Sequence, residues 1–110
     1  MREVKFRALL TVEDKRWWEY YTTLREPDWL DFQDVEITIK DLQFTGLHDK
    51  NGKEIWEGDI VAANHTTNQT IEYEHDRFIL KPDNYDLWKV CEYWEVIGNI
   101  FSNPELLEAR

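Results

Sequence analysis

The sequence predicts a mainly β fold, a small β-barrel built from about five or six strands. Three observations support this prediction. Apolar Val35, Ile37 and Ile39 alternate with polar residues, which gives a strand one buried face and one solvated face. The step Asn51-Gly52 separates two apolar arms, as it does in hairpins. Gly58 interrupts the second arm, where a glycine permits the sharp bend that a small barrel needs at its corners.

The first element lies between Thr11 and Gln33, and the spacing of its apolar residues does not distinguish a strand from a helix. The run from Arg16 to Tyr21 is rich in aromatic residues but too short to separate a strand from a helix. Pro27 ends any helix before Trp29. We expect a strand followed by an extended loop.

Two hairpins are expected in the middle of the chain. In the first, the arms around Phe44 and over 55–61 flank a tight turn at 49–52, in which the Asn-Gly step takes positive φ values. A polar loop follows over 64–68. The apolar alternation over 71–80 then predicts two short strands that turn near Asp76-Arg77.

The last third of the chain is expected to hold one long strand and a short helical turn. Residues 87–100 are rich in Trp, Val and Ile, which is typical of a strand. Asn103 is expected to cap a helical turn over 104–109 that has Pro104 at its first position. Leu106 and Leu107 would then cover an open end of the barrel.

Length and composition predict one domain over residues 1–110, with some aromatic side chains exposed on its surface. Six Trp, five Tyr and five Phe exceed what a core of this size usually keeps out of water. Cys91 is the single cysteine, so the chain forms no internal disulfide, and no apolar run is long enough to span a bilayer. These features indicate a reduced cytosol and no membrane partner.

The charge balance disfavours direct binding to nucleic acid. The chain has 23 acidic and 13 basic residues, a formal net charge of −10. Affinity for DNA or RNA comes largely from Lys and Arg that displace counterions, and this surface would repel phosphates. Two interpretations stay open: the charge keeps the protein soluble, or an acidic face docks on a basic protein groove.

The sequence contains no catalytic constellation, so we expect a protein that is not an enzyme and needs no cofactor. The four glycines are isolated and form no phosphate-binding loop. Cys91 has no base beside it in the sequence and is expected to pack as a small apolar group.

Two histidines are a candidate metal pair. His65, in the 64–68 loop, and His75, near the next turn, could meet in a barrel and bind zinc. The alternative is that both are solvated loop residues, which the absence of paired Cys ligands favours.

Two groups of residues are candidates for binding a partner protein. On a regular strand, acidic side chains at alternate positions would point to one side about 7 Å apart and could mimic phosphates; a solvated strand face is the alternative. Exposed Trp and Tyr beside charged residues are typical interface anchors, although about half of such rings belong to a core. The acidic group is Glu72, Glu74 and Asp76, and the aromatic group is Trp17, Trp18, Tyr21 and Trp29.

Three stretches carry a family resemblance: residues 42–61, residues 95–107 and Lys5-Phe6-Arg7. Together they closely resemble the YopX family of phage and prophage proteins. The resemblance implies an SH3-like small β-barrel, of which Gly58-Asp59-Ile60-Val61 forms a central bend. The chain departs from the family at Leu9-Leu10 and in the Trp-rich segment that follows. We therefore expect a variable N-terminal β extension over 1–40 and a barrel with its C-terminal turn over 41–110.

The resemblance, the lack of a catalytic set and the negative charge together predict the function. We expect a phage accessory protein that binds a host protein with a basic surface in the host cytoplasm. An inhibitor of a nucleic-acid-handling defence enzyme, such as a CRISPR nuclease, fits these features. The alternatives are a structural or regulatory module that binds a phage partner and a zinc- or small-ligand-binding protein.

Overall fold

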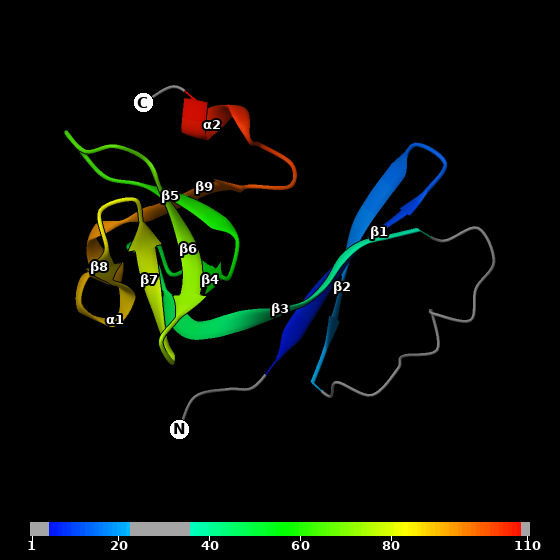
Figure 1. The fold of residues 1–110 in the computed structure, drawn as a ribbon, viewed down its shortest axis with the longest axis horizontal. Helices are drawn as coiled ribbons and strands as arrows, with labels where there is room; N and C mark the ends of the chain where they lie inside the picture. The colour runs from blue at the N-terminus through cyan, green and yellow to red at the C-terminus, as the bar shows by residue number, and fades with distance from the viewer. Residues whose placement is uncertain (1–4, 23–35, 109–110) are drawn as a thin grey trace. The chain divides into compact units, whose positions relative to one another are not determined.

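The computed structural model describes residues 5–22 and 36–108 (Figure 1). The chain divides into two compact units, residues 1–44 and 45–110. Strands dominate both units, and the second ends in a short helix, so the expected mainly β fold is confirmed. The predicted strand residue Val35 and the expected loop around Pro27 lie outside the described residues.

Three antiparallel strands form the first unit: β1 (Phe6–Val12), β2 (Lys15–Tyr21) and the first part of β3 (Glu36–His48). The central strand, β1, pairs with β2 from Phe6↔Tyr21 to Val12↔Lys15 and with β3 on its other side. Its Ala8, Leu9 and Leu10 are buried. The strand expected around Arg16 to Tyr21 is therefore confirmed, because pairing with an apolar central strand decides its period.

The second part of β3 forms the predicted hairpin with β4 (Glu54–Trp56). Gly52 has a φ of +82°, whereas Asn51 is not in the left-handed region, so the expected turn geometry is wrong in one detail. The connection spans residues 49–53, where the Asp49 N–H donates to the Lys53 carbonyl (2.8 Å) and the Gly52 N–H to the Asp49 carbonyl (3.0 Å), so it is not a two-residue Asn-Gly turn. The Asp49 carboxylate holds it in this form by accepting the N–H groups of Asn51 (2.8 Å) and Lys53 (2.9 Å).

The second unit contains a five-stranded sheet with the order β8-β7-β6-β5-β9 in the described residues. The predicted strands over 71–80 are β6 (Gln69–Glu74) and β7 (Arg77–Lys81). His75 and Asp76, both with positive φ, form the two-residue turn between them. The polar loop at 64–68 joins β5 (Asp59–Ala62) to β6, as expected.

Gly58 makes the predicted bend between β4 and β5. Its φ is +88°, its N–H donates to the Ile71 carbonyl (2.8 Å) and its carbonyl accepts from Ile100 (2.9 Å). A Cβ at this position would lie 2.9 Å from the Phe101 ring. Both the backbone conformation and the close approach therefore require glycine.

The long strand expected over 87–100 is wrong. The segment forms α1 (Leu87–Val90), the 3-10 turn η2 (Cys91–Tyr93) and only then β9 (Glu95–Asn99). The buried side chains of Leu87, Cys91 and Trp94 recur every three or four residues, a helical period that the abundance of Trp and Val obscured. With β8 (Tyr85–Asp86), the described residues contain nine strands instead of five or six.

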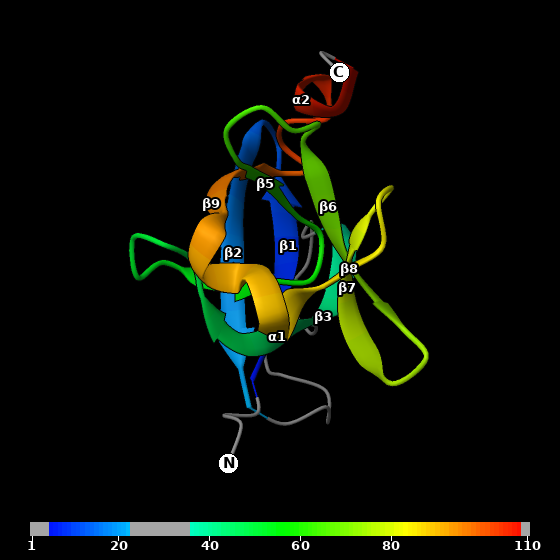
Figure 2. The same cartoon turned by 90° about the vertical axis from the view of Figure 1, so that its left-hand side faces the viewer.

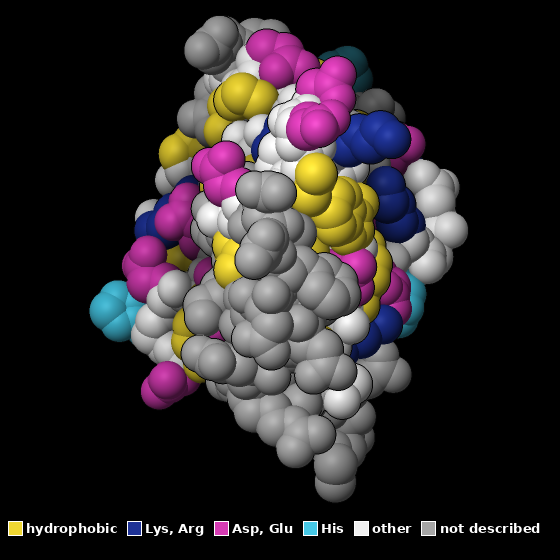
Figure 3. All heavy atoms as spheres, turned by 90° about the vertical axis from the view of Figure 1, so that its right-hand side faces the viewer, with side chains coloured by type: hydrophobic (Ala, Val, Ile, Leu, Met, Phe, Trp, Pro, Cys, Tyr) yellow, Lys and Arg dark blue, Asp and Glu magenta, His cyan; other side chains and the backbone are white. Residues whose placement is uncertain are grey.

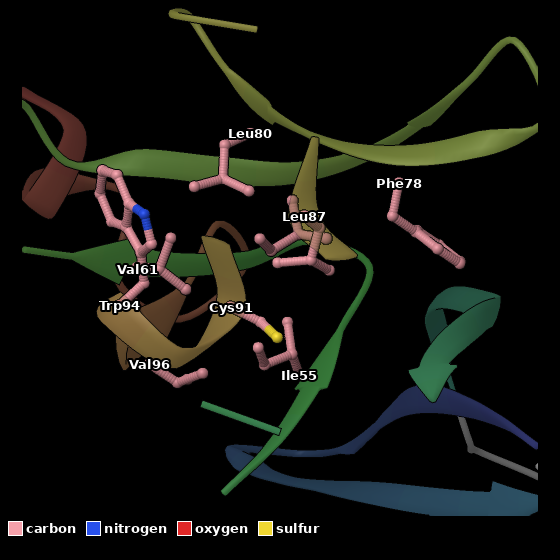
Figure 4. Close-up of a cluster of buried hydrophobic side chains, with 9 residues drawn as sticks. Ile55, Val61, Phe78, Leu80, Leu87, Cys91, Trp94 and Val96 are labelled. Atoms are coloured by element: carbon pink, nitrogen blue, oxygen red, sulfur yellow. The ribbon is translucent and has the colours of Figure 1, made fainter. Parts of the chain in front are cut away.

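The core of the second unit lies between its curled sheet and the 87–93 segment (Figure 4). Side chains from strands and from this segment point toward one another, so the short helical elements close one side of the barrel. The buried cluster consists of Ile55, Val61, Ile71, Phe78, Leu80, Leu87, Cys91, Trp94 and Val96.

The C-terminal helix α2 (Glu105–Glu108) begins later than expected. Asn103 Oδ1 accepts the Asn99 N–H (3.2 Å) rather than an N–H group of the helix, while its carbonyl accepts from Leu106 (3.1 Å). The expected side-chain cap is therefore wrong, because Asn103 holds the preceding turn instead. Leu106 and Leu107 are half-buried, and Asn68 Nδ2 donates to the Leu106 carbonyl (2.9 Å).

Gly52→Val should destabilise the protein by about 1 kcal/mol or more, because a β-branched residue is strained at positive φ. No heavy atom lies within 4 Å of the site of a Cβ there, so the effect comes from the backbone alone. Denaturant unfolding measures it. Gly52→Asn is the control and should cost less, since Asn tolerates this conformation; an equal midpoint for Gly52→Val and the parent would contradict the prediction.

Asp49→Ala should destabilise the second unit by about 2 kcal/mol or more, because it leaves the buried Val96 N–H and the partly buried Asn51 and Lys53 N–H groups without their acceptor. Burial alone would raise the pKa of Asp49, but the N–H groups of Val96, Lys53 and Asn51 and the Lys53 charge outweigh it and lower the pKa below 3.8. The contribution is therefore complete above pH 3.8 and is lost as the pH falls through the folded-state pKa.

Urea unfolding at pH 7 and at about pH 3 tests both parts of this prediction. Asp49→Asn should lose less stability than the parent on acidification, since it has no carboxylate to protonate. Asp76→Asn, in an exposed turn, is the matched control and should behave like the parent. Equal acid sensitivity of Asp49→Asn and the parent would show that Asp49 is not the group responsible.

Candidate functional site

The structure separates the two predicted groups of interface residues. Trp17, Trp18 and Tyr21 lie on β2 in the first unit, whereas the acidic group belongs to the β6–β7 hairpin of the second unit. Trp29 lies outside the described residues. Each group therefore has to be considered as a separate candidate surface.

The two adjacent tryptophans of β2 point to opposite faces of the sheet, as neighbours on a strand must. Trp18 lies under the Arg7 guanidinium, whose carbon is 4.0 Å from the ring centroid. Trp17 is 36% exposed, and its Nε1 donates to Glu19 Oε1 (2.8 Å). Trp17 is thus the accessible member of the pair, while Trp18 contributes to packing around buried Arg7.

Tyr21 uses its hydroxyl within the fold. The hydroxyl donates to Asp41 Oδ1 (2.5 Å) and accepts the Asp41 N–H (2.7 Å), and the ring stacks on Phe6. Asp41 lies in the middle of β3 with a φ of +63°, close to the register shifts between β3 and β1. The hydrogen bonds with Tyr21 therefore stabilise a strained backbone conformation in the sheet. Burial and the hydrogen bond to Asp41 raise the pKa of Tyr21 well above its ordinary value.

The acidic row predicted on β6 contains two members rather than three. The strand ends at Glu74, and Asp76 lies in the turn at a φ of +65°, so it does not continue the row. Lys81 Nζ is 3.3 Å from Glu74 Oε2, and Arg77 pairs with Glu74 in the register. Glu72 Oε2 accepts from the Thr70 hydroxyl (3.0 Å). This face therefore carries both signs of charge, which weakens its resemblance to a phosphate backbone.

The two candidate metal ligands lie at opposite ends of β6. His65 precedes the strand and His75 follows it, and six residues of strand span about 20 Å. Both side chains are exposed, and His75 Nε2 lies 3.6 Å from Glu74 Oε1. The structure does not bring the two together, and the described residues hold no group of three His, Cys, Asp or Glu suited to a metal ion.

Cys91 is buried in the helical segment, although the sequence placed it in a strand. Burial raises the pKa of its thiol, and the neighbouring Glu92 carboxylate adds to the rise. A raised pKa disfavours the thiolate that nucleophilic chemistry needs. The expected packing role of Cys91 agrees with this environment.

Sequence reasoning missed one exposed segment, residues 85–93, in which the side chains of Tyr85, Trp88 and Tyr93 are exposed; we call it the 85–93 aromatic surface. Trp88 is 65% exposed and Tyr93 is 70% exposed, the two most exposed large hydrophobic side chains in the described residues. The helical spacing of Leu87, Cys91 and Trp94 would have placed Trp88 and Tyr93 outside the core. The expectation of a strand concealed this signal.

Negative charge is concentrated in the second unit. Residues 45–110 contain 13 of the 23 acidic residues but only six of the 13 basic ones. On the face that Figure 3 shows, Asp and Glu side chains lie among Lys, Arg and hydrophobic ones instead of forming one acidic area.

Comparisons with known proteins give a family and a similar fold. A family model described as YopX protein matches residues 1–108. A solved structure, the crystal structure of protein EF1440 from Enterococcus faecalis, is 30% identical with a TM-score of 0.50, covering 91% of this chain and 74% of that one. No curated protein matches the chain. Among the described residues, no helix has the length and apolar character to cross a membrane.

Trp18→Ala should lower the free energy of unfolding by about 2 kcal/mol or more, because it removes packing and a cation–π contact with a buried guanidinium. Trp17→Ala is the matched control on the same strand and should cost less. Denaturant unfolding followed by far-ultraviolet circular dichroism compares the two. A larger loss of unfolding free energy for Trp17→Ala than for Trp18→Ala would contradict the prediction and show that Trp17 is the ring that stabilises the fold.

Proposed function

The chain belongs to the YopX protein family, and from this premise we propose that it is a non-enzymatic phage accessory protein that binds a basic host protein. Family membership makes it a small phage-associated protein. The finer assignment depends on the physical character of its surface, which favours association over chemistry. We place this activity in the host cytoplasm.

The observation that carries the proposal is the exposure of aromatic rings on a strongly acidic chain. Trp and Tyr anchors supply much of the binding energy of protein interfaces, because each buries a large area and loses little conformational entropy. An aromatic ring that stays in water does not contribute the free energy that its burial would provide, either in the core or in an interface. In the described part of the chain, the exposed rings are Trp17, Tyr20, Tyr73, Tyr85, Trp88 and Tyr93.

The net charge of −10 selects the class of partner. Attraction between an acidic protein and a basic groove accelerates encounter and falls with ionic strength. Enzymes that handle nucleic acid present such grooves, because they bind phosphates. An inhibitor of a defence nuclease, for instance a CRISPR nuclease, is the proposed role.

Capture of host proteins on immobilised protein tests this proposal. The experiment is run with lysate at low and at moderate salt, with an unrelated acidic protein of similar size and charge as the control. A basic nuclease or polymerase retained by this chain alone supports the proposal. Retention of phage proteins only would favour the alternative, a structural or regulatory phage module.

Neutralising the acidic hairpin should slow association with such a partner by about tenfold at low salt and much less at high salt. The variant carries Glu72→Gln, Glu74→Gln and Asp76→Asn. A control with Asp14→Asn, Glu36→Gln and Glu105→Gln removes the same charge from other exposed positions.

Stopped-flow or surface-binding kinetics on the purified pair gives the association rates, and circular dichroism checks the fold. A reduction specific to the hairpin variant supports a local role for its acids. Equal rates for the hairpin variant and the parent at low salt would exclude this hairpin from the interface.

A further inference from the structure

We propose that the 85–93 aromatic surface is a docking site for an arginine-rich segment of a partner protein. This inference rests on the proposed function and adds to it the site and the chemistry that the site recognises. It is carried by three observations: rigid display of the rings, a cation already bound to one of them, and complementary charge.

The rings stand on a segment whose opposite side is fixed in the core. Leu87, Cys91 and Trp94 are buried, so α1 and η2 cannot rotate without disrupting the barrel (Figure 4). Figure 2 shows α1 and the start of β9 on the side that faces the viewer. The five residue steps from Trp88 to Tyr93 rise about 8–10 Å along the segment, about the length of three residues of an extended peptide.

Trp88 already holds a cation in the free protein. Lys89 Nζ lies 5.3 Å from the centroid of its ring, and Asp86 Oδ2 lies 3.5 Å from the same ammonium. A carboxylate and an aromatic face thus share one positive group. An arginine from a partner would find the same chemistry, and its planar guanidinium stacks on an indole more favourably than an ammonium does.

The charge around the rings matches a basic segment. Asp83, Asp86, Glu92 and Glu95 surround the aromatic residues in the sequence, against Lys89 as the sole basic residue from 83 to 95. Glu92 is exposed, and Glu95 faces Lys50 at 4.0 Å, a distance at which the pairing is weak. An incoming guanidinium would therefore meet both a ring and a carboxylate.

The other candidate surfaces have their polar groups engaged. The Trp17 indole N–H donates to Glu19, and the Trp18 ring lies against Arg7. On the β6–β7 hairpin, Lys81 lies within ion-pair distance of Glu74. These internal contacts compete with a basic ligand. Lys89 and Arg77 likewise pair with Asp86 in the 85–93 aromatic surface, but Glu92 and the ring of Tyr93 are exposed there.

Titration of the isotope-labelled full chain with short peptides tests the proposal by NMR. The probe is an acetylated peptide of alternating arginine and glycine, and matched lysine–glycine and glutamate–glycine peptides are the controls. We expect the Trp88 indole resonance and the amides of Glu92 and Tyr93 to shift with the arginine peptide. The lysine peptide should bind severalfold more weakly, and the glutamate peptide should cause no shift.

Trp88→Ala should weaken binding of the arginine peptide by about tenfold or more. Tyr20→Ala, which removes an exposed ring from the first unit, is the matched control and should bind like the parent. Glu92→Lys is a second variant that leaves the ring in place and should weaken binding at low salt. Circular dichroism confirms that each variant is folded.

The outcomes separate this inference from the proposed function. Shifts centred on Trp17 or on the β6–β7 hairpin, or unchanged affinity of Trp88→Ala and Glu92→Lys, would overturn the docking site. A basic host protein captured equally by Trp88→Ala and the parent would also overturn it, yet leave the proposed function standing. Trp88-dependent peptide binding without any captured basic protein would support the site and count against the proposed function.

Discussion

Closure of the second unit depends on one buried carboxylate, that of Asp49. Its Oδ1 accepts the N–H groups of Asn51 and Lys53 in the hairpin loop, and its Oδ2 accepts the N–H of Val96 in β9 (2.8 Å). Beside it, the Lys50 N–H donates to the Trp94 carbonyl (3.0 Å). One side chain thus fixes the shape of a turn and joins it to a strand 47 residues away. A charge can be buried here because backbone dipoles replace its lost hydration.

The same region links the core to the proposed interface. Trp94, whose carbonyl the hairpin holds, fills the core together with Leu87 and Cys91. Their helical spacing turns Trp88 and Tyr93 outward. The exposed rings are therefore a consequence of how the barrel closes, and they are held in place by neighbouring side chains that are buried in the core. A rigid display of this kind reduces the entropy lost on binding.

The net charge of −10 opposes self-association through the exposed aromatic rings. Excess negative charge keeps copies apart, while ion pairs such as Glu74 with Lys81 and Asp86 with Arg77 balance the face of the β6–β7 hairpin. In the proposed complex, the partner supplies the positive charge that allows the rings to be buried. Attraction would select such a partner, and the aromatic contacts would retain it.

Local chemistry determined the features that the sequence predicts correctly. The hairpin at Gly52, the bend at Gly58 and the turn before Arg77 follow from positive-φ positions and period-2 alternation, which act over a few residues. Only the tertiary structure decided the rest. Whether 87–93 is helix or strand depends on which core its apolar side chains meet. Likewise, Trp18, Lys81 and Asp49 each contact a residue on another strand: Arg7, Glu74 and Val96. Those contacts form only once the chain is folded, so no local pattern encodes which aromatic rings remain in water.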